Sequence, residues 1–292
     1  MKIWKDEKIP GAVRITADAP GPRAVLFAGV HGDEVSGIHA VEKLFFDFFT
    51  EARRLQKGSL TLVRANALAI AAERRYVKHN LNRLYKDSYG TEIDHSSYEF
   101  CRAQELKTIL ESCDYFLDLH SAPIAQDAFL VAEKEAVDFY RKLGIPKIMT
   151  GWGKFSGGAI GGDGENYANA HGATSATLES GSHFEKRSND VAYQAVVSFL
   201  SLLGMITGVR EQPSPPLEIV DVYAVVTKDF DDFRYAGEPG NFKLIKKGDA
   251  FAFQNDRPMT VREDTYLLIP MKPEDTKVKE EVCYLGRRVD GS

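Results

Sequence analysis

Apolar segments of two kinds alternate along the first two thirds of the chain. Short uninterrupted apolar runs predict buried strands, and longer segments with apolar residues three and four positions apart predict helices. Strands are expected at 24–30, 59–65, 115–120, 128–132 and 173–178, and helices at 34–55, 97–113, 135–143 and 191–205. This alternation predicts an α/β fold whose central sheet has helices on both faces.

The pattern changes after residue 211. Three prolines within 212–216 prevent a helix and stiffen the chain. Strand-like runs then follow at 219–226, 241–245, 250–253 and 266–270, with Gly, Pro and Asp between them. We therefore expect an α/β domain over 1–211, a Pro-rich linker at 212–216 and a small all-β C-terminal domain over 217–292.

Composition narrows the class of protein. The chain of 292 residues is 43% hydrophobic and 27% charged, which is typical of a packed globular protein. Its net charge of -5 gives no reason to expect a nucleic-acid partner. The N-terminus lacks a secretory apolar segment, and no apolar run reaches the roughly 18 residues of a membrane span, so we expect a cytoplasmic protein without a membrane partner. The oligomeric state stays open, with a homo-oligomer among the alternatives.

The three cysteines, Cys101, Cys113 and Cys283, are too few and too scattered for a disulfide framework or a cysteine zinc site. We expect free thiols, which fits a reducing compartment.

His31 and Glu34 stand in the segment His-Gly-Asp-Glu, directly behind the predicted strand 24–30, and His120 ends the predicted strand 115–120. Ligand sites in α/β sheets form beyond the carboxyl ends of strands, so these side chains can converge. Two histidines and a carboxylate make a three-ligand zinc set with one position open for water or substrate. The alternative is two unrelated histidines at strand ends.

Asp118 lies two residues before His120, so both side chains share one face of the predicted strand. A carboxylate there can orient an imidazole ligand from behind, although an ion pair with a nearby arginine explains it equally well. The His-x-x-Glu spacing recurs at His39 and Glu42, inside a predicted helix, where we interpret it as a solvent-exposed face.

Arg75, Asn82 and Arg83 lie in a polar stretch between a predicted strand and the next helix. Guanidinium groups bind carboxylates in two-pronged geometry, so this set beside a zinc site indicates a small-molecule substrate with a free carboxylate. For any single one of these arginines, a basic surface loop is the simpler interpretation.

Glu179 ends an apolar strand-like run and is a candidate general base, which a zinc hydrolase needs to take a proton from zinc-bound water. Taken alone, such a residue is more often a helix cap or an ion-pair partner. The Gly-rich stretch 151–164 has no phosphate-binding motif and leads to a strand rather than clearly to a helix. We interpret it as an active-site loop, in which Lys154, or Tyr167 beyond it, is a candidate substrate contact. His171 and His183 receive no role.

The candidate residues, taken together and in order, resemble the signature of the succinylglutamate desuccinylase/aspartoacylase family, which is related to the zinc carboxypeptidases. The resemblance covers roughly 24–181 and rests on His31-x-x-Glu34, Arg75, Asn82-Arg83, Asp118-Leu119-His120 and Glu179. It implies a mixed central sheet with helices on both faces and, more loosely, the β-rich C-terminal domain.

The resemblance also implies roles. The two histidines and Glu34 would bind one zinc ion per chain, and Glu179 would be general base and then general acid. Arg75 would stabilise the oxyanion, while Asn82 and Arg83 would hold a substrate carboxylate. A tyrosine that the C-terminal domain supplies in some relatives cannot be placed from the sequence.

One departure is that Asn80 stands where family members often have Asp, but Asn can also cap the turn. The leading hypothesis is a zinc-dependent amidohydrolase that removes an acyl group from an N-acyl amino acid or a similar small carboxylated amide. The alternatives are a zinc carboxypeptidase acting on peptides and a non-catalytic zinc-binding or ligand-binding protein. Neither the acyl group nor the amino acid follows from the sequence.

Overall fold

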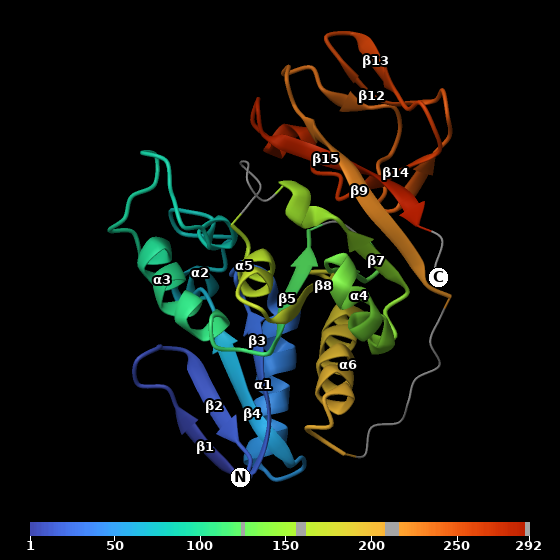
Figure 1. Cartoon of the computed structure of the whole chain (residues 1–292). Coiled ribbons are helices and arrows are strands. Elements are labelled where there is room, and N and C mark those ends of the chain that lie inside the picture. Colours follow the sequence, from blue (N-terminus) through green and yellow to red (C-terminus); the bar gives the residue numbers. More distant parts are fainter. Residues whose placement is uncertain (124–125, 156–161, 208–215, 290–292) are drawn as a thin grey trace.

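One large sheet runs through the molecule in the computed structural model (Figure 1), which describes residues 1–123, 126–155, 162–207 and 216–289. Twelve strands pair in the order β1-β2-β4-β3-β5-β8-β6-β7-β9-β15-β14-β11, and a second sheet has the order β10-β12-β13. The strands of the large sheet are β1 (Lys2–Lys5), β2 (Ala12–Thr16), β3 (Ala19–Ala28), β4 (Lys57–Arg64), β5 (Tyr115–Ala122), β6 (Phe129–Val131), β7 (Lys147–Thr150), β8 (Thr174–Ser182), β9 (Glu218–Thr227), β11 (Lys243–Ile245), β14 (Thr265–Leu268) and β15 (Glu281–Val289).

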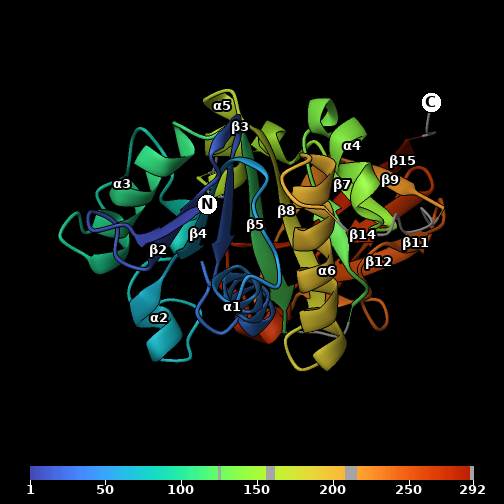
Figure 2. The same cartoon turned by 90° about the horizontal axis from the view of Figure 1, so that it is seen from below.

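Helices cover both faces of this sheet (Figure 2). They are α1 (Val35–Phe49), α2 (Ala67–Ala71), α3 (Tyr98–Leu110), α4 (Lys134–Tyr140), α5 (Gly164–Ala170) and α6 (Lys186–Leu202). Helices α1 and α6 share one hydrophobic core with Leu117 and Leu119 of β5, whereas α3 and α5 share another with Phe116. Pairing is both parallel, as for β3 with β5, and antiparallel, as for β6 with β8. The predicted mixed α/β sheet with helices on both faces is confirmed.

Alternation along β5 positions the candidate site. Successive side chains of a strand point to opposite faces. Because Leu117 and Leu119 face α1 and α6, Phe116, Asp118 and His120 point to the face of α3 and α5. The strand therefore carries a hydrophobic residue, a carboxylate and an imidazole in sequence toward its carboxyl end.

Several predicted boundaries were wrong by a few residues. Helix α1 ends at Phe49 rather than at 55, because Glu51 has a φ of 59°, in the left-handed region that a helix cannot continue. Strand β3 begins at Ala19, and a shift in its pairing register with β4 before Arg23 accommodates the Gly-Pro pair. Strand β8 continues to Ser182, so Glu179 lies within the strand and not at its end.

The C-terminal part is rich in strands, and its first strand extends the central sheet, because β9 pairs in parallel with β7. Residues from β9, β15 and β14 pack around a hydrophobic core together with β12 (Ala250–Gln254), which pairs with β10 (Arg234–Tyr235) and β13 (Arg257–Thr260). Within 216–289 the helical segment is one 3-10 turn, Pro273–Asp275. The domain boundary at the linker stays a prediction, since 212–215 lie outside the described residues.

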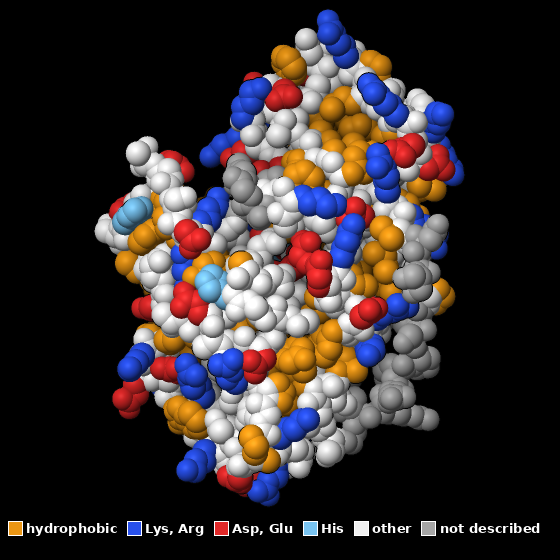
Figure 3. Space-filling view, in the orientation of Figure 1, with side chains coloured by type: hydrophobic (Ala, Val, Ile, Leu, Met, Phe, Trp, Pro, Cys, Tyr) orange, Lys and Arg blue, Asp and Glu red, His pale blue; other side chains and the backbone are white. Residues whose placement is uncertain are grey.

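The outer surface adds little to the functional picture. On the face shown in Figure 3, Lys and Arg side chains are interspersed with Asp and Glu side chains. No helix in the described part of the chain is long and apolar enough to cross a membrane. Cys101, Cys113 and Cys283 are free thiols, of which Cys101 alone is exposed.

Candidate active site

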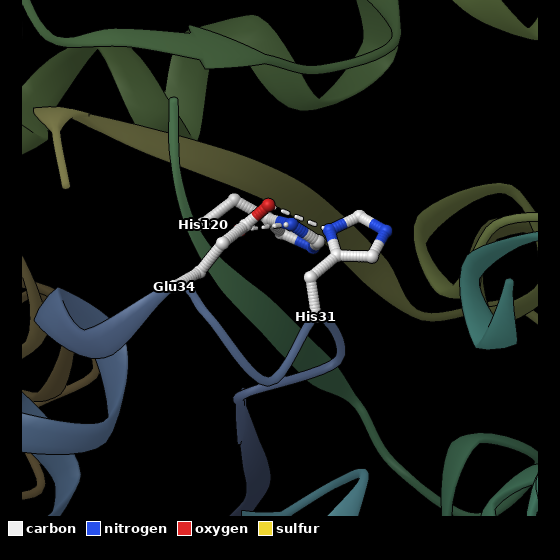
Figure 4. A group of neighbouring side chains, drawn as sticks. All are labelled: His31, Glu34 and His120. Atoms are coloured by element: carbon white, nitrogen blue, oxygen red, sulfur yellow. Dashed lines mark hydrogen bonds and ion pairs between the residues drawn. The ribbon is translucent and has the colours of Figure 1, made fainter. Parts of the chain in front are cut away.

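His31, Glu34 and His120 converge at the carboxyl ends of β3 and β5 (Figure 4). His31 lies in the turn after β3, Glu34 immediately precedes α1, and His120 lies near the end of β5. One Glu34 oxygen is 2.7 Å from His31 Nδ1, and the other is 2.9 Å from His120 Nδ1. Gly32 is needed in this turn, since a Cβ there would lie 2.1 Å from the carbonyl carbon of Ala69. All three side chains are buried.

The protonation behaviour of the three side chains differs. Burial, reinforced by the nearby Arg75 charge, lowers the pKa of His31 to about 3. Burial also opposes charging of His120, but the Asp118 and Glu34 carboxylates outweigh it and hold the pKa of His120 well above its usual range. Burial likewise disfavours the Glu34 carboxylate, yet the two histidines keep its pKa well below the usual value.

A second layer of polar groups lies against both imidazole rings. Asp118 Oδ2 is 3.0 Å from His120 Nε2, on the side of the ring away from Glu34. Asn80 Oδ1 is 3.1 Å from His31 Nε2 and also accepts a hydrogen bond from the Asn82 backbone N–H. Asn80 therefore caps its turn, as expected, and in addition orients His31, which the sequence analysis did not predict.

These three side chains fit a zinc ion. Their ligand atoms all lie within 4.8 Å of one another, and two imidazoles with one carboxylate are a donor set that zinc prefers. The outer nitrogen of each ring meets an oxygen, as is usual for histidines that bind metals. His39 and Glu42 belong to neither of the two candidate metal groups found among the described residues.

The predicted guanidinium groups lie at the same site. Arg75 Nη1 is 3.1 Å from Glu34 Oε1, and Arg83 Nη2 is 3.5 Å from Glu281 Oε1. Their loop is shaped by the buried Glu99 of α3, whose carboxylate accepts hydrogen bonds from the backbone N–H groups of residues 77 and 78. The loop thus has a fixed course, while the Arg75 side chain remains 46% exposed and able to meet a ligand.

Glu179 lies beside His120, because the two residues are register partners in the parallel pair of β5 and β8. Partners in neighbouring strands point to the same face of a sheet. Burial, followed by the Glu34 charge, raises the pKa of Glu179 to about 7, and its Oε2 has no hydrogen-bond partner among the described residues. A carboxylate in this state can both accept and return a proton.

One cavity of about 400 Å³ is lined by the predicted metal, substrate and general-base residues His31, Glu34, Arg75, Asn82, Arg83, His120 and Glu179. The C-terminal part closes part of its wall with residues 269–272, 275 and 276. Tyr284 of β15 is buried nearby, where it packs on Trp152, a further lining residue, with 4.7 Å between ring centroids. These residues reach the cavity only through the tertiary fold, so no local sequence pattern indicated that they line it.

The stretch 151–164 differs from its prediction. It leads directly into helix α5, not into a strand, with Asp163 as the N-cap residue. Trp152 and Asp163 line the cavity, but residues 156–161 of the stretch lie outside the described residues. Lys154 and Tyr167 are not among the cavity-lining residues described: Lys154 binds Asp221 at 2.8 Å, and the Tyr167 hydroxyl donates to Glu111 at 2.6 Å.

Two histidines without an assigned role also have partners. His171 Nδ1 lies 2.8 Å from the carbonyl oxygen of Tyr167. His183 Nδ1 lies 2.8 Å from the Ser121 hydroxyl, and His183 forms a second candidate metal group with Asp33 and Glu34. Nothing in the sequence around His183 distinguishes it from a surface histidine.

Comparison with known proteins decides the family. Residues 20–203 match the model of the succinylglutamate desuccinylase/aspartoacylase catalytic domain. The chain belongs to the succinylglutamate desuccinylase/aspartoacylase family. The matched range contains every residue of the candidate zinc, guanidinium and general-base set.

Named relatives match this chain over different lengths. A succinylglutamate desuccinylase from Pseudoalteromonas atlantica is 25% identical over 273 residues, or 84% of this chain and 76% of that protein. A human N-acyl-aromatic-L-amino acid amidohydrolase (carboxylate-forming) is 31% identical over 124 residues, 39% of this chain and 38% of that protein. The crystal structure of succinylglutamate desuccinylase from Vibrio cholerae shares the fold, with a TM-score of 0.78, 20% identity, and coverage of 96% of this chain and 86% of that one.

Proposed function

We propose that this protein is a zinc-dependent amidohydrolase that removes the acyl group from an N-acyl amino acid or a similar small amide with a free carboxylate. The observation that carries the proposal is the convergence of His31, Glu34 and His120 in one cavity with Glu179 and the Arg75–Arg83 loop. Family membership supports hydrolysis of an amide bond, since the named relatives are a desuccinylase and an amidohydrolase.

The residues divide the chemistry between them. A zinc ion held by the two histidines and Glu34 would supply Lewis acidity toward the scissile carbonyl and lower the pKa of water. Glu179 would take the proton from the attacking water and pass it to the amide nitrogen, which leaves poorly unless protonated. Arg75 would offset the charge that grows on the carbonyl oxygen. Asn82 and Arg83 would hold the free carboxylate of the substrate.

Cavity size favours a small substrate over a peptide. A volume of about 400 Å³ is at the lower end of typical small-molecule sites, and residues 269–276 border it from the C-terminal part. A peptide would need an open path for the residues on the N-terminal side of the scissile bond. We therefore rank a peptide substrate behind a single N-acyl amino acid.

The test is a hydrolysis screen with zinc-loaded full-length protein. N-acetyl and N-succinyl derivatives of a range of amino acids are compared with a panel of short peptides. We expect turnover of at least one N-acyl amino acid and little release from peptides. Turnover of peptides alone would replace the proposal by the carboxypeptidase alternative, and turnover of neither, with zinc bound, would leave a binding protein.

A further inference from the structure

Part of the cavity wall is acidic, in contrast to the part formed by the arginines. Its carboxylates come from α5 and the residues next to it. Asp163 and Glu165 both line the cavity, and Glu133 lies close to them. Asp163 accepts hydrogen bonds from Trp152 Nε1 at 3.1 Å and from the Asn166 backbone N–H at 2.8 Å. Glu133 accepts one from the Gly153 N–H at 2.7 Å. These two carboxylates therefore have structural partners.

Glu165 is different. The residue is only 1% exposed, and its Oε1 has no hydrogen-bond partner among the described residues. Burial, together with the charges of Asp163 and Glu133, raises the pKa of Glu165 well above its usual range. A buried polar atom without a partner is costly and uncommon in folded proteins, so it calls for an explanation. A cationic ligand group would supply the missing partner.

The described cations of the cavity do not fill this role. Arg75 pairs with Glu34 and Arg83 with Glu281, while Lys272 is exposed. Two lysines on neighbouring elements, Lys154 and Lys134, lie 2.8 Å and 3.5 Å from Asp221 instead. Nor does a divalent ion fit, because Glu165 belongs to neither candidate metal group found in the described part of the chain.

Strand register gives the position of Glu165 relative to the reacting groups. In β8, Thr177 and Glu179 point to the same face, and Thr177 contributes a hydrogen bond to Glu165. Glu179 pairs with His120, whereas Thr177 pairs with Asp118, one step deeper along the strands. Residues two apart in a strand are separated by roughly 7 Å. Glu165 thus lies beside the Thr177–Asp118 pair, one step along the strands from Glu179 and His120.

We propose that the substrate is an N-acyl amino acid whose side chain ends in an ammonium group, and that Glu165 binds this group. The inference rests on the proposed deacylase function and extends it. The free carboxylate of the substrate is held on the side of Asn82 and Arg83, and the side-chain cation is held on the side of Glu165. Glu165 is then the residue that determines specificity.

Three side chains of similar length test the proposal with zinc-loaded protein. The Nα-acetyl and Nα-succinyl derivatives of ornithine carry a cation, those of norleucine are neutral and nearly isosteric, and those of glutamate carry an anion. We expect kcat/KM for ornithine to exceed that for norleucine by about tenfold or more, the range of a charge-assisted hydrogen bond. Glutamate is expected to be the poorest of the three.

The variant Glu165→Gln keeps the shape of the side chain but cannot lose a proton to become a carboxylate when a cation binds. We expect it to lower kcat/KM for the ornithine derivative by about tenfold and to change that for norleucine by less than about threefold. The control Glu135→Gln removes one charge from an exposed position on α4, away from the cavity, and should leave the ratio unchanged. An unchanged ratio in Glu165→Gln, or a wild-type protein that prefers norleucine or glutamate, overturns the proposal.

Calorimetric binding separates this proposal from the hydrolase function. If no derivative is hydrolysed, the deacylase function fails, but the ornithine derivative should still bind more tightly than the norleucine derivative to wild type. That difference should disappear in Glu165→Gln. Equal binding of the two derivatives to wild type would count against the cation site whatever the protein hydrolyses.

Discussion

The two charged sides of the cavity hold their charges in different ways. The guanidinium side chains of Arg75 and Arg83 are partly exposed and pair with single carboxylates at 3.1 and 3.5 Å. On the acidic side, Asp163 and Glu165 are buried, and Asp163 is fixed by indole and backbone donors. Exposed charges are screened by water and free to move, whereas buried charges act strongly and in one place. The basic side is therefore suited to attracting and orienting many carboxylates, and the acidic side to selecting among side chains.

Loss of a zinc ligand should abolish turnover whatever the two sides of the cavity bind, and this is the largest effect that we expect. In His120→Ala the cluster loses one of three ligands, and zinc affinity should fall by more than about 10²-fold, the upper range for loss of an outer partner of a ligand. Metal analysis of the purified protein after dialysis measures this. His39→Ala, which alters the other His-x-x-Glu copy, should retain full zinc content; equal zinc retention by His120→Ala would refute the ligand assignment.

Replacing the general base leaves both sides intact and should stop turnover. Positioned acid–base groups contribute roughly 10²–10⁴-fold, so we expect Glu179→Gln to lower kcat by about that factor. KM and zinc content should change far less, because Gln preserves the shape and Glu179 is outside the ligand set. Steady-state kinetics with metal analysis measures all three quantities. A near-normal kcat would exclude Glu179 as proton carrier, and loss of zinc would move it into the ligand set.

The difference between the sides also decides what could be predicted from the sequence. The zinc ligands follow uninterrupted apolar strands, so their position at the carboxyl ends of these strands could be predicted from the local pattern. Arg75 and Arg83 lie beyond the unpredicted helix α2, and only the family resemblance indicated their individual roles. The acidic side depends on α5, a seven-residue helix with Gly and two Asn, whose intrinsic helix propensity is low. Packing of Tyr167 and Ala168 into the core stabilises this helix, and a local pattern cannot reveal that. The one local sequence feature that indicates this helix is Asp163 at its N-cap.

The C-terminal part shows the same limit. Strand β15 was not predicted, because charged residues at both ends mask its apolar centre. It nevertheless pairs with β9 and β14 and carries Glu281, the partner of Arg83. Contacts between segments some 200 residues apart come from sheet topology, which strand-like patterns alone do not specify.

The basic side can be weakened without touching the acidic side. Arg83→Lys keeps the charge but loses the two-pronged geometry, so KM for a carboxylated substrate should rise by about tenfold with a smaller change in kcat. Methyl esterification of the substrate carboxylate should have a comparable effect in wild type and little further effect in the variant. Equal kinetics for acid and ester in wild type would mean that Arg83 does not hold a carboxylate.

The last prediction concerns the stability of the fold and not turnover, and it tests the acidic side alone. The pKa of Glu165 is raised in the folded protein from an ordinary value near 4.5, so between these values the folded state holds a proton that the unfolded state has lost. Stability linked to Glu165 is thus fully present below about pH 4.5 and is lost as pH rises through the folded-state pKa, by about 1.4 kcal/mol for each unit of the shift. Glu165→Gln has no such proton to lose.

Denaturant unfolding from pH 4.5 to 8 should therefore show the variant gaining stability over wild type as pH rises, while Glu135→Gln follows wild type. If a saturating ornithine derivative then narrows the gap between wild type and Glu165→Gln, the bound cation compensates the Glu165 carboxylate. A gap that is absent without ligand would show that burial does not raise the pKa of Glu165.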